Sequence, residues 1–282
     1  MIALAAAVAL STGTAFKTPG FSAPAAVLWD EGARLFYVSN VAGAPGAKDG
    51  QGWLSLLGAD GRILGPRWAS GLNAPQGLAL SRGRLYVADV DHLAVVDPAT
   101  GGVLSRLPAP GAKRLTDVSA APDGTVYVSD PLADVIWRLS PDGTFEEWAR
   151  GDRLEGPSAL RVRGGRLYVA SWGRAAPDLS TKIPGRLYWL DLRTGERHDV
   201  SKAPLGNLSG LEPASGGGWL VTDRKSGKLW RVSYPRGEAE LLASGLEGAA
   251  DLGYDPKLRL IVVPCMGSDL VEALQQDKLP RF

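Results

Sequence analysis

The sequence has few of the residues on which several common kinds of site depend. Cys265 is the only cysteine among 282 residues, which excludes an internal disulfide, and its apolar surroundings predict a buried, unreactive thiol. His92 and His198 are the only histidines and have no partner histidine nearby, which argues against a zinc site. Neither accompanies a Gly-x-Ser-x-Gly motif of a serine hydrolase.

The chain also lacks a strong charge and any sign of a domain boundary. Its formal net charge is +1, and a nucleic-acid-binding surface normally needs a basic patch, so we expect no nucleic-acid partner. No linker, low-complexity tract or long amphipathic helix is evident in the sequence. We therefore expect a single domain.

The N-terminus begins with an apolar run over residues 1–10, followed by the small and polar residues 11–15. This pattern is typical of a secretory signal peptide, although a basic start is missing, and the alternative is an N-terminal core segment. We expect residues 1–15 to be a signal peptide, residues 16–282 to be the mature domain, and the protein to be periplasmic or extracellular. The run is too short to span a membrane, so we expect no membrane span.

A segment of short strands and turns recurs along the chain. Tyr86, Tyr127 and Tyr168 follow one another at steps of 41 residues, each within a motif such as Leu-Tyr-Val-Ala-Asp. The same frame fits around Tyr37, Leu220 and Ile261, and two of the copies carry insertions. A repeat of about 40 residues with four short apolar runs and Gly- or Pro-containing turns is typical of a β-propeller blade.

The six copies predict an all-β, six-bladed β-propeller with four antiparallel strands per blade. The last copy leaves little sequence for a fourth strand before Phe282. We therefore expect a strand within residues 16–22 to complete the sixth blade, which would hide the sheet edges at both termini.

Propeller geometry predicts that one mouth of the central channel carries the site. The residues just before each first strand and just after each second strand ring this mouth. The positions before the first strands are Ala26, Gln76, Thr116, Ser158, Ser209 and Ala250, and the next positions are Val27, Gly77, Asp117, Ala159, Gly210 and Asp251. The second strands end at Asn40, Asp89, Asp130, Ser171, Asp223 and Pro264. A repeated Asp there is typical of an Asx-type turn, in which the side chain bonds to the backbone two residues on.

At these positions the chain resembles the SMP-30/gluconolactonase/LRE-like family of six-bladed propellers over nearly its whole length. The resemblance rests on AAVLWD (25–30) with LFYVSN (35–40), APQGL (74–78), LTDV (115–118) with PDG (122–124), GPSAL (156–160) and LSGL (208–211). In the family, Glu, Asn, Asn and Asp at four of the mouth positions hold the Ca²⁺ or Zn²⁺ that activates a lactone or phosphoester. This resemblance implies a propeller related to metal-dependent hydrolases.

The four metal-ligand positions are substituted in this chain. They carry Ala26, Thr116, Ser158 and Ser209, which provide neither a carboxylate nor an amide oxygen. A calcium site needs about six to eight oxygen ligands, some of them charged. We therefore expect no metal site and no cofactor.

Asp117 and Asp251 are the candidate catalytic residues if a shifted Ca²⁺ or Zn²⁺ site has replaced the original one. A shift of one residue along a regular strand turns a side chain to the opposite face, so neither carboxylate should point into the channel unless a bulge re-aims it. The alternative for Asp117 is a structural role as an acceptor of backbone N–H groups.

Two insertions distinguish their blades from the other copies of the repeat. They follow the second strands of the first and fourth blades, over residues 41–52 and 172–184, and so lie on opposite sides of the same mouth. Two facing loops suggest a lid over a ligand, although Trp172 could equally pin its own loop. The candidate ligand-binding residues are Gln76, Thr116, Ser158, Ser209, Trp172, Arg174 and Asn40.

Three hypotheses of function follow. The first is an exported, monomeric propeller that binds an uncharged or weakly anionic small molecule at the mouth without a metal. The alternative is a metal-dependent hydrolase of lactones or esters with a shifted metal site. The second alternative is an NHL-type propeller that binds another protein. Whether the chain is an enzyme stays open at this stage.

Overall fold

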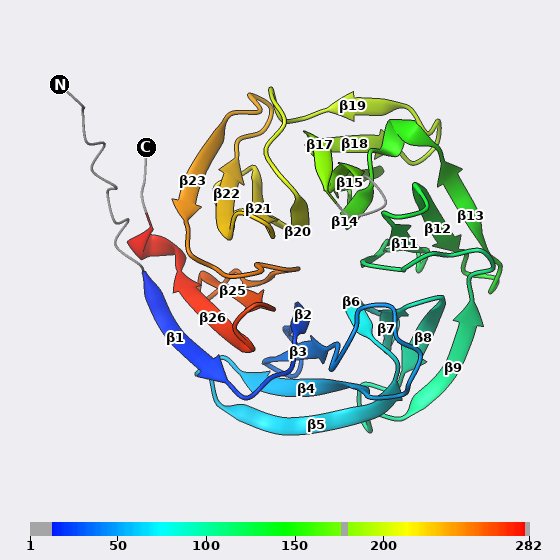
Figure 1. Cartoon of the computed structure of the whole chain (residues 1–282), viewed down its shortest axis with the longest axis vertical. Helices are drawn as coiled ribbons and strands as arrows, with labels where there is room; N and C mark the ends of the chain where they lie inside the picture. Colours follow the sequence, from blue (N-terminus) through cyan, green and yellow to red (C-terminus); the bar gives the residue numbers. More distant parts are fainter. Residues whose placement is uncertain (1–12, 176–179, 280–282) are drawn as a thin grey trace.

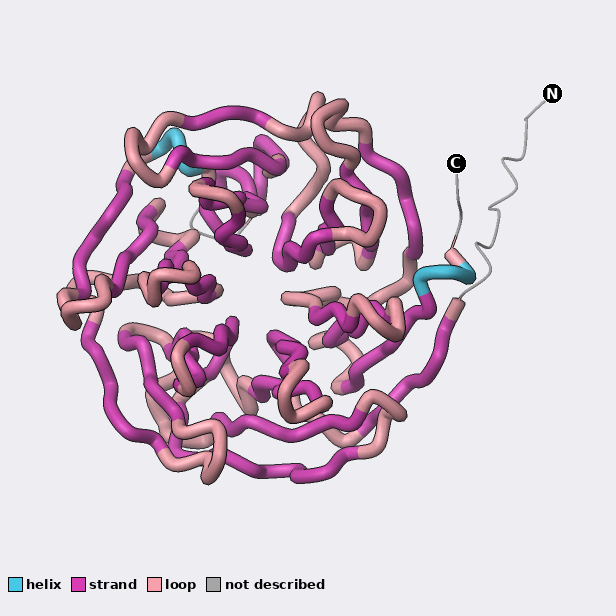
Figure 2. The backbone as a smooth tube through the Cα atoms, turned by 180° about the vertical axis from the view of Figure 1, so that it is seen from behind, coloured by secondary structure: helices cyan, strands magenta, loops and turns pink. Residues whose placement is uncertain are grey.

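Six four-stranded antiparallel sheets surround a central channel in the computed structural model, which describes residues 13–175 and 180–279 (Figure 1). The predicted all-β class, blade number and strand number are confirmed. The only helical segments in the described part of the chain are two short 3-10 helices, η1 (Asp152–Leu154) and η2 (Gln276–Lys278), and Figure 2 shows a ring of strands joined by loops and turns.

The blades follow one another along the chain. Blade 1 is β2 (Pro24–Asp30), β3 (Leu35–Asn40), β4 (Gly52–Gly58) and β5 (Ile63–Leu72); blade 2 is β6 (Pro75–Ser81), β7 (Arg84–Asp89), β8 (His92–Val96) and β9 (Val103–Pro108). Blade 3 is β10 (Val118–Ala120), β11 (Val126–Asp130), β12 (Val135–Leu139) and β13 (Phe145–Arg150); blade 4 is β14 (Pro157–Arg163), β15 (Arg166–Ser171), β18 (Leu187–Asp191) and β19 (Arg197–Asp199). Blade 5 is β20 (Leu208–Pro213), β21 (Trp219–Asp223), β22 (Lys228–Val232) and β23 (Ala239–Ala243).

Blade 6 is closed by strands from both ends of the chain. It contains β24 (Gly253–Asp255), β25 (Leu260–Cys265), β26 (Leu270–Gln275) and, on its outer edge, β1 (Thr14–Pro19), which runs antiparallel to β26. The predicted closing strand is confirmed and starts slightly earlier than residue 16. The expected signal peptide falls mainly on residues 1–12, outside the described residues, whereas Thr14 and Ala15 already belong to β1.

The strands differ in burial according to their place in the blade. Inner strands such as β11 are buried along their whole length, because neighbouring blades cover both faces. This explains why motifs such as Val-Tyr-Val read as continuous apolar runs. The outermost strand β1 alternates between half-buried and exposed residues, as expected for a strand with one face in water.

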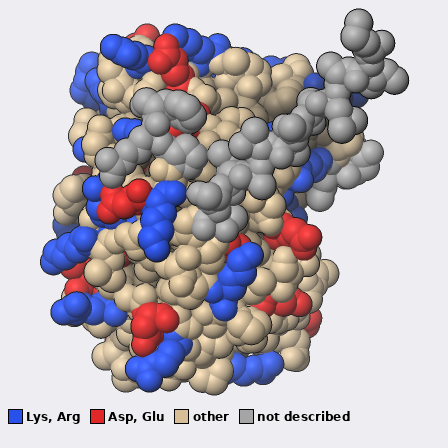
Figure 3. Space-filling model, turned by 90° about the vertical axis from the view of Figure 1, so that its left-hand side faces the viewer, with Lys and Arg blue, Asp and Glu red and all other residues tan. Residues whose placement is uncertain are grey.

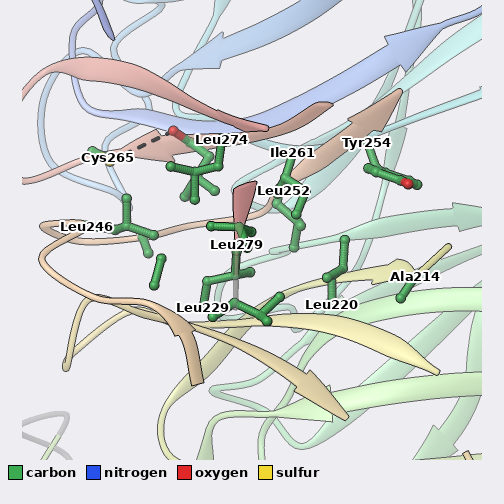
Figure 4. Close-up of a cluster of buried hydrophobic side chains, with 14 residues drawn as sticks. Ala214, Leu220, Leu229, Leu246, Leu252, Tyr254, Ile261, Cys265, Leu274 and Leu279 are labelled. Atoms are coloured by element: carbon green, nitrogen blue, oxygen red, sulfur yellow. Dashed lines mark hydrogen bonds between the residues drawn. The ribbon is translucent and has the colours of Figure 1, made fainter. Parts of the chain in front are cut away.

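The hydrophobic core consists of separate clusters, each lying between two adjacent blades. Six such clusters follow the ring in order from the contact of blades 1 and 2 to the contact of blades 6 and 1. Figure 4 shows the cluster between blades 5 and 6, in which Leu220 and Leu229 pack with Ile261 and Leu274. Burying one such side chain stabilises the fold by about 1.5–3 kcal/mol.

Cys265 belongs to this cluster, as its sequence context predicted. Its thiol is buried and lies near the carbonyl oxygen of Val263 (Figure 4). Burial raises the pKa of Cys265 to about 12, with a smaller contribution from Glu272. Because the thiolate is the reactive form, the thiol is unreactive at neutral pH.

The repeated polar residues at the ends of the second strands tie the mouth of the ring together. Asp89 accepts hydrogen bonds from the backbone N–H groups of Asn73 and Ala74, which lead into the first strand of the same blade. Equivalent bonds join Asp130 to Lys113 and Arg114, Asp223 to Asn207, and Asn40 to Ser22. The predicted structural role of this repeated motif is therefore confirmed, but these bonds reach back to the segment ahead of the first strand and not to the residue two positions on, as an Asx-type turn would require.

The surface carries no dominant charge on the side seen in Figure 3, where basic and acidic side chains are interspersed. Within the described ranges, no helix has the length and apolar character needed to cross a membrane.

We expect removal of β1 to destabilise the ring. A chain that starts at Gly20 would leave β26 as an unpaired edge and expose the cluster between blades 6 and 1, to which Phe16 contributes. The melting temperature should fall by roughly 10 °C or more, measured by circular dichroism. A chain that starts at Thr14 keeps β1 and serves as the control; equal melting temperatures for the two chains would show that the ring closes without β1.

Candidate functional site

A pocket opens at the mouth of the channel that the sequence predicted to carry the site. Blades 2 to 5 contribute to its lining, which consists of Gln76, Arg114, Thr116, Pro131, Leu132, Ser158, Trp172 and Arg224. The enclosed space is about 20 Å³, enough for one or two water-sized groups. The head group of a ligand can therefore be enclosed, while a larger body would lie in the open mouth.

Four of the predicted ligand-binding residues meet in this pocket, namely Gln76, Thr116, Ser158 and Trp172. The other three do not line it. Ser209 is buried on β20, and Arg174 is exposed on the hairpin β16 (Gly173–Ala175) and β17 (Thr181–Pro184). Asn40 is fully buried, and its amide bonds to Ser22, Val38 and Ser55, so its position is that of a structural residue.

The two insertions behave differently. The insertion of blade 4 supplies Trp172, whose backbone carbonyl accepts a hydrogen bond of 2.8 Å from the Asn207 amide. Asn207 also bonds to Thr181 on β17 and so fixes the base of this hairpin. The insertion of blade 1 is attached to blade 2 through an ion pair of 2.5 Å between Lys48 and Asp91, and none of its described residues lines the pocket.

Two side-chain nitrogens of residues that line the pocket have no hydrogen-bond partner among the described residues. The side-chain nitrogens Nε2 of Gln76 and Nε1 of Trp172 are buried donors without an acceptor, and Gln76 is only 5% exposed. An unpaired buried donor costs about 1–3 kcal/mol, so it usually serves a ligand or an ordered water. Because both residues line the pocket, each nitrogen is a candidate donor to a ligand atom there.

Two arginines give the pocket a positive charge that the sequence analysis did not anticipate. Burial lowers the pKa of Arg224 to about 10, and the positive charge of Arg114 lowers it further. Burial likewise lowers the pKa of Arg114, and the carboxylate of Asp130 offsets this effect in part. No carboxylate from the described part of the chain lines the pocket, so its lining is cationic.

The positions of these arginines could have been found from the sequence. Arg224 directly follows Asp223 at the end of a second strand, and Arg114 lies two residues before Thr116. Both lie within one or two residues of the positions, before a first strand or at the end of a second strand, that ring the mouth. The sequence could not show that their side chains converge.

The candidate catalytic residues lie deeper in the channel, beneath the pocket. Asp117 and Asp251 line a second, smaller space together with Arg161 and Glu212. The expectation for a regular strand, that neither aspartate faces the channel, does not hold. Ser129 bonds to both Thr116 and Asp117 through its backbone, so two residues oppose one, which is the geometry of a β-bulge.

Asp117 acts as a brace between blades. Its carboxylate accepts hydrogen bonds from the backbone N–H groups of Val118 at 2.7 Å and Leu160 at 2.6 Å, the latter on blade 4. Asp251 of blade 6 likewise accepts a backbone hydrogen bond from Leu211 of blade 5 and shares a side-chain hydrogen bond with Asp117. The backbone-acceptor alternative for Asp117 is thus confirmed, whereas a catalytic role of either aspartate stays a prediction.

The channel cluster combines one cation with three acidic groups. Arg161 forms an ion pair with Glu212, which leaves Asp117 and Asp251 to share a hydrogen bond with each other. Burial raises the pKa of Asp117 to about 7. Burial and the charge of Asp117 raise the pKa of Asp251 well above its ordinary value.

Neither set of residues fits a metal ion. The mouth positions carry a methyl group and three hydroxyls beside two guanidinium groups, and positive charge repels a cation. In the channel, the oxygens of Asp117 already serve two backbone N–H groups. In residues 13–175 and 180–279, no group of three or more His, Cys, Asp or Glu side chains is placed to hold a metal.

Comparisons with known proteins support the fold. No family model and no curated protein matches the sequence. A solved gluconolactonase from Xanthomonas campestris has 19% identity and a TM-score of 0.66, covering 99% of this chain and 94% of its own. A solved streptogramin B lyase has 11% identity and a TM-score of 0.62, covering 94% of this chain and 98% of its own. At these identities the similarity shows the propeller fold.

The shared proton of Asp117 and Asp251 predicts an unusual pH dependence of stability. Their pKa values are raised in the folded state, so folding retains protons that the unfolded chain releases above about pH 4. Their contribution to the free energy of unfolding should therefore be complete below about pH 4 and fall as the pH rises from about 4 to 7. Urea unfolding across this range measures the slope.

Asp251→Asn removes one titrating group. The slope of the free energy of unfolding against pH should become less steep by the amount that corresponds to about one bound proton. Asp97→Asn is the matched control, because backbone hydrogen bonds lower the pKa of Asp97 and it titrates below this range. An unchanged slope in Asp251→Asn would refute the protonated pair.

Proposed function

We propose that this propeller is an exported, monomeric binding protein whose mouth pocket holds the carboxylate of a small organic molecule. The observation that carries the proposal is the convergence of Arg114 and Arg224 with unpaired donors from Gln76 and Trp172. Charge-assisted hydrogen bonds from a guanidinium group are the strongest that an anion finds in a protein. A bound carboxylate would also relieve the repulsion between the two arginines.

The shape and walls of the pocket favour a small molecule with an apolar portion. Pro131, Leu132 and Trp172 form apolar walls, and Leu132 is 40% exposed at the rim. Thr116 and Ser158 add hydroxyl groups that can fix the orientation of the head group. Apolar contact normally supplies most of the affinity of such pockets, whereas the polar groups supply specificity.

The structural neighbours are consistent with a small-molecule ligand. Their names, gluconolactonase and streptogramin B lyase, both refer to enzymes that act on small molecules. An acid such as gluconate, which forms when its lactone opens, carries the carboxylate that the arginines would bind. Hydrolysis through a metal held by Asp117 and Asp251 has no support from their hydrogen bonds, and we do not propose it.

Calorimetry with matched probes tests the proposal. We expect 3-phenylpropanoate or D-gluconate to bind and the uncharged 3-phenylpropanol and glucitol to bind much more weakly. Arg224→Gln should weaken carboxylate binding by about 1.5–3 kcal/mol, the usual contribution of a charged hydrogen bond. Arg193→Gln, at an exposed turn at the other end of blade 4, should leave it unchanged.

The same variant separates a binding role from a structural one. Burial and Arg114 disfavour the charged form of Arg224 in the free protein. Arg224→Gln should therefore keep or raise the melting temperature while binding is lost. A large drop in melting temperature, or equal affinity for acids and alcohols, would contradict the proposal.

We also propose that the wild-type protein has no divalent-metal cofactor. Calorimetry should detect no micromolar binding of Ca²⁺ or Zn²⁺. Restoring the ligand set with Ala26→Glu, Thr116→Asn, Ser158→Asn and Ser209→Asp should create Ca²⁺ affinity, because a cation relieves the repulsion of two added carboxylates. Micromolar binding by the wild type would instead favour the hydrolase with a shifted metal.

A further inference from the structure

A second and larger cleft lies between blades 4 and 5, at the end of the ring opposite the mouth pocket. It encloses about 330 Å³ and is lined by Arg163, Gly164, Arg166, Tyr168, Gly217, Gly218, Trp219 and Tyr234. These residues come from the turn between β14 and β15, the turn between β20 and β21, and the turn that follows β22, all at the end away from the mouth. The cleft is therefore independent of the proposed carboxylate site.

Aromatic side chains form one part of the cleft. The rings of Tyr168 and Trp219 are nearly buried and lie with their centroids 4.1 Å apart. Tyr234 stands edge-on to Tyr168, with centroids 6.2 Å apart, and is 42% exposed. An exposed large aromatic beside a buried aromatic pair offers a planar ligand a surface on which to stack.

Two arginines form the other part. The Arg166 guanidinium lies 4.2 Å from the centroid of the Trp189 ring and donates a hydrogen bond of 2.8 Å to the hydroxyl of Tyr234. These contacts hold its planar group in one orientation. Arg163 is exposed at the same turn, and no carboxylate from the described residues lines the cleft with them.

Glycines keep the cleft open at its blade 5 wall. Gly217 has a φ of 93°, and a Cβ atom there would meet nothing within 4 Å. At Gly217 and Gly218 the wall is therefore backbone without side chains, next to the rings of Trp219 and Tyr234.

We propose that this cleft binds a planar aromatic anion, with its ring against Tyr234 and its charged group held by Arg163 and Arg166. The volume of about 330 Å³ lies at the lower end of the range for small-molecule sites, which begins near 300 Å³. Guanidinium groups can bind both parts of such a ligand, because they pair with carboxylates or phosphates and stack on aromatic faces. The fixed orientation of Arg166 reduces the entropy lost on binding.

The probe for this site is 2-naphthyl phosphate, measured by calorimetry against the uncharged 2-naphthylmethanol. The experiment uses the full chain with Arg224→Gln as background, which weakens the anion site at the mouth. We expect binding to persist in this background and to weaken at least 10-fold on adding Arg163→Gln and Arg166→Gln. Arg193→Gln in the same background is the control for charge, and melting temperatures report whether each variant is folded.

Three results would overturn the proposal. Unchanged affinity in the double variant would show that the arginines do not hold the anion. Loss of binding on Arg224→Gln alone would place the probe at the mouth. Equal affinity for the uncharged analogue would show that the cleft does not select an anion. Should Arg166→Gln unfold the protein, Arg163→Gln alone, at an exposed position, must still reduce the affinity measurably.

Discussion

Apolar packing between adjacent blades is the interaction on which the rest of this structure depends. Each cluster joins two neighbouring sheets, so no blade has a complete core of its own. At the sixth contact β1 brings residues such as Phe16 from the start of the chain to the edge of the last blade. Closing the ring fixes the distances between the innermost strands, and these distances decide which side chains meet at the centre.

Two repeated features organise the mouth of the ring: hydrogen bonds from the backbone to the side chains at the ends of the second strands, and register shifts at the starts of the first strands. Asp89 and its equivalents bind the backbone ahead of the first strands of blades 1, 2, 3 and 5. Register shifts occur at the starts of the first strands of blades 1, 2, 4 and 5, and a bulge lies at Thr116 and Asp117 in blade 3. A bulge allows consecutive residues to face the channel, so Thr116 lines the upper pocket while Asp117 lines the space beneath it.

Opposite charges are separated along the channel. Arg114 and Arg224 stand at the mouth beside hydroxyl and amide groups. Deeper in the channel, Asp117 and Asp251 share a hydrogen bond near Arg161. Among the described residues no carboxylate lines the outer layer, although Asp130 lies near Arg114, so the two arginines can receive an anion. The inner layer is satisfied by backbone N–H groups and holds blades 3 to 6 together. The same blades thus supply the proposed binding groups at the mouth and, beneath them, the groups that connect neighbouring blades.

The sequence by itself determined the architecture, because blade period, turn residues and apolar runs are local properties that each copy repeats. It also identified Gln76, Thr116, Ser158 and Trp172 as mouth residues, since every blade places the same strand ends there. Only the tertiary structure decided the charge of the pocket, because the side chain of Arg114 meets that of Arg224 across more than one blade. Strand alternation failed at Asp117 because a bulge breaks the period of two, and such a bulge depends on the neighbouring blade.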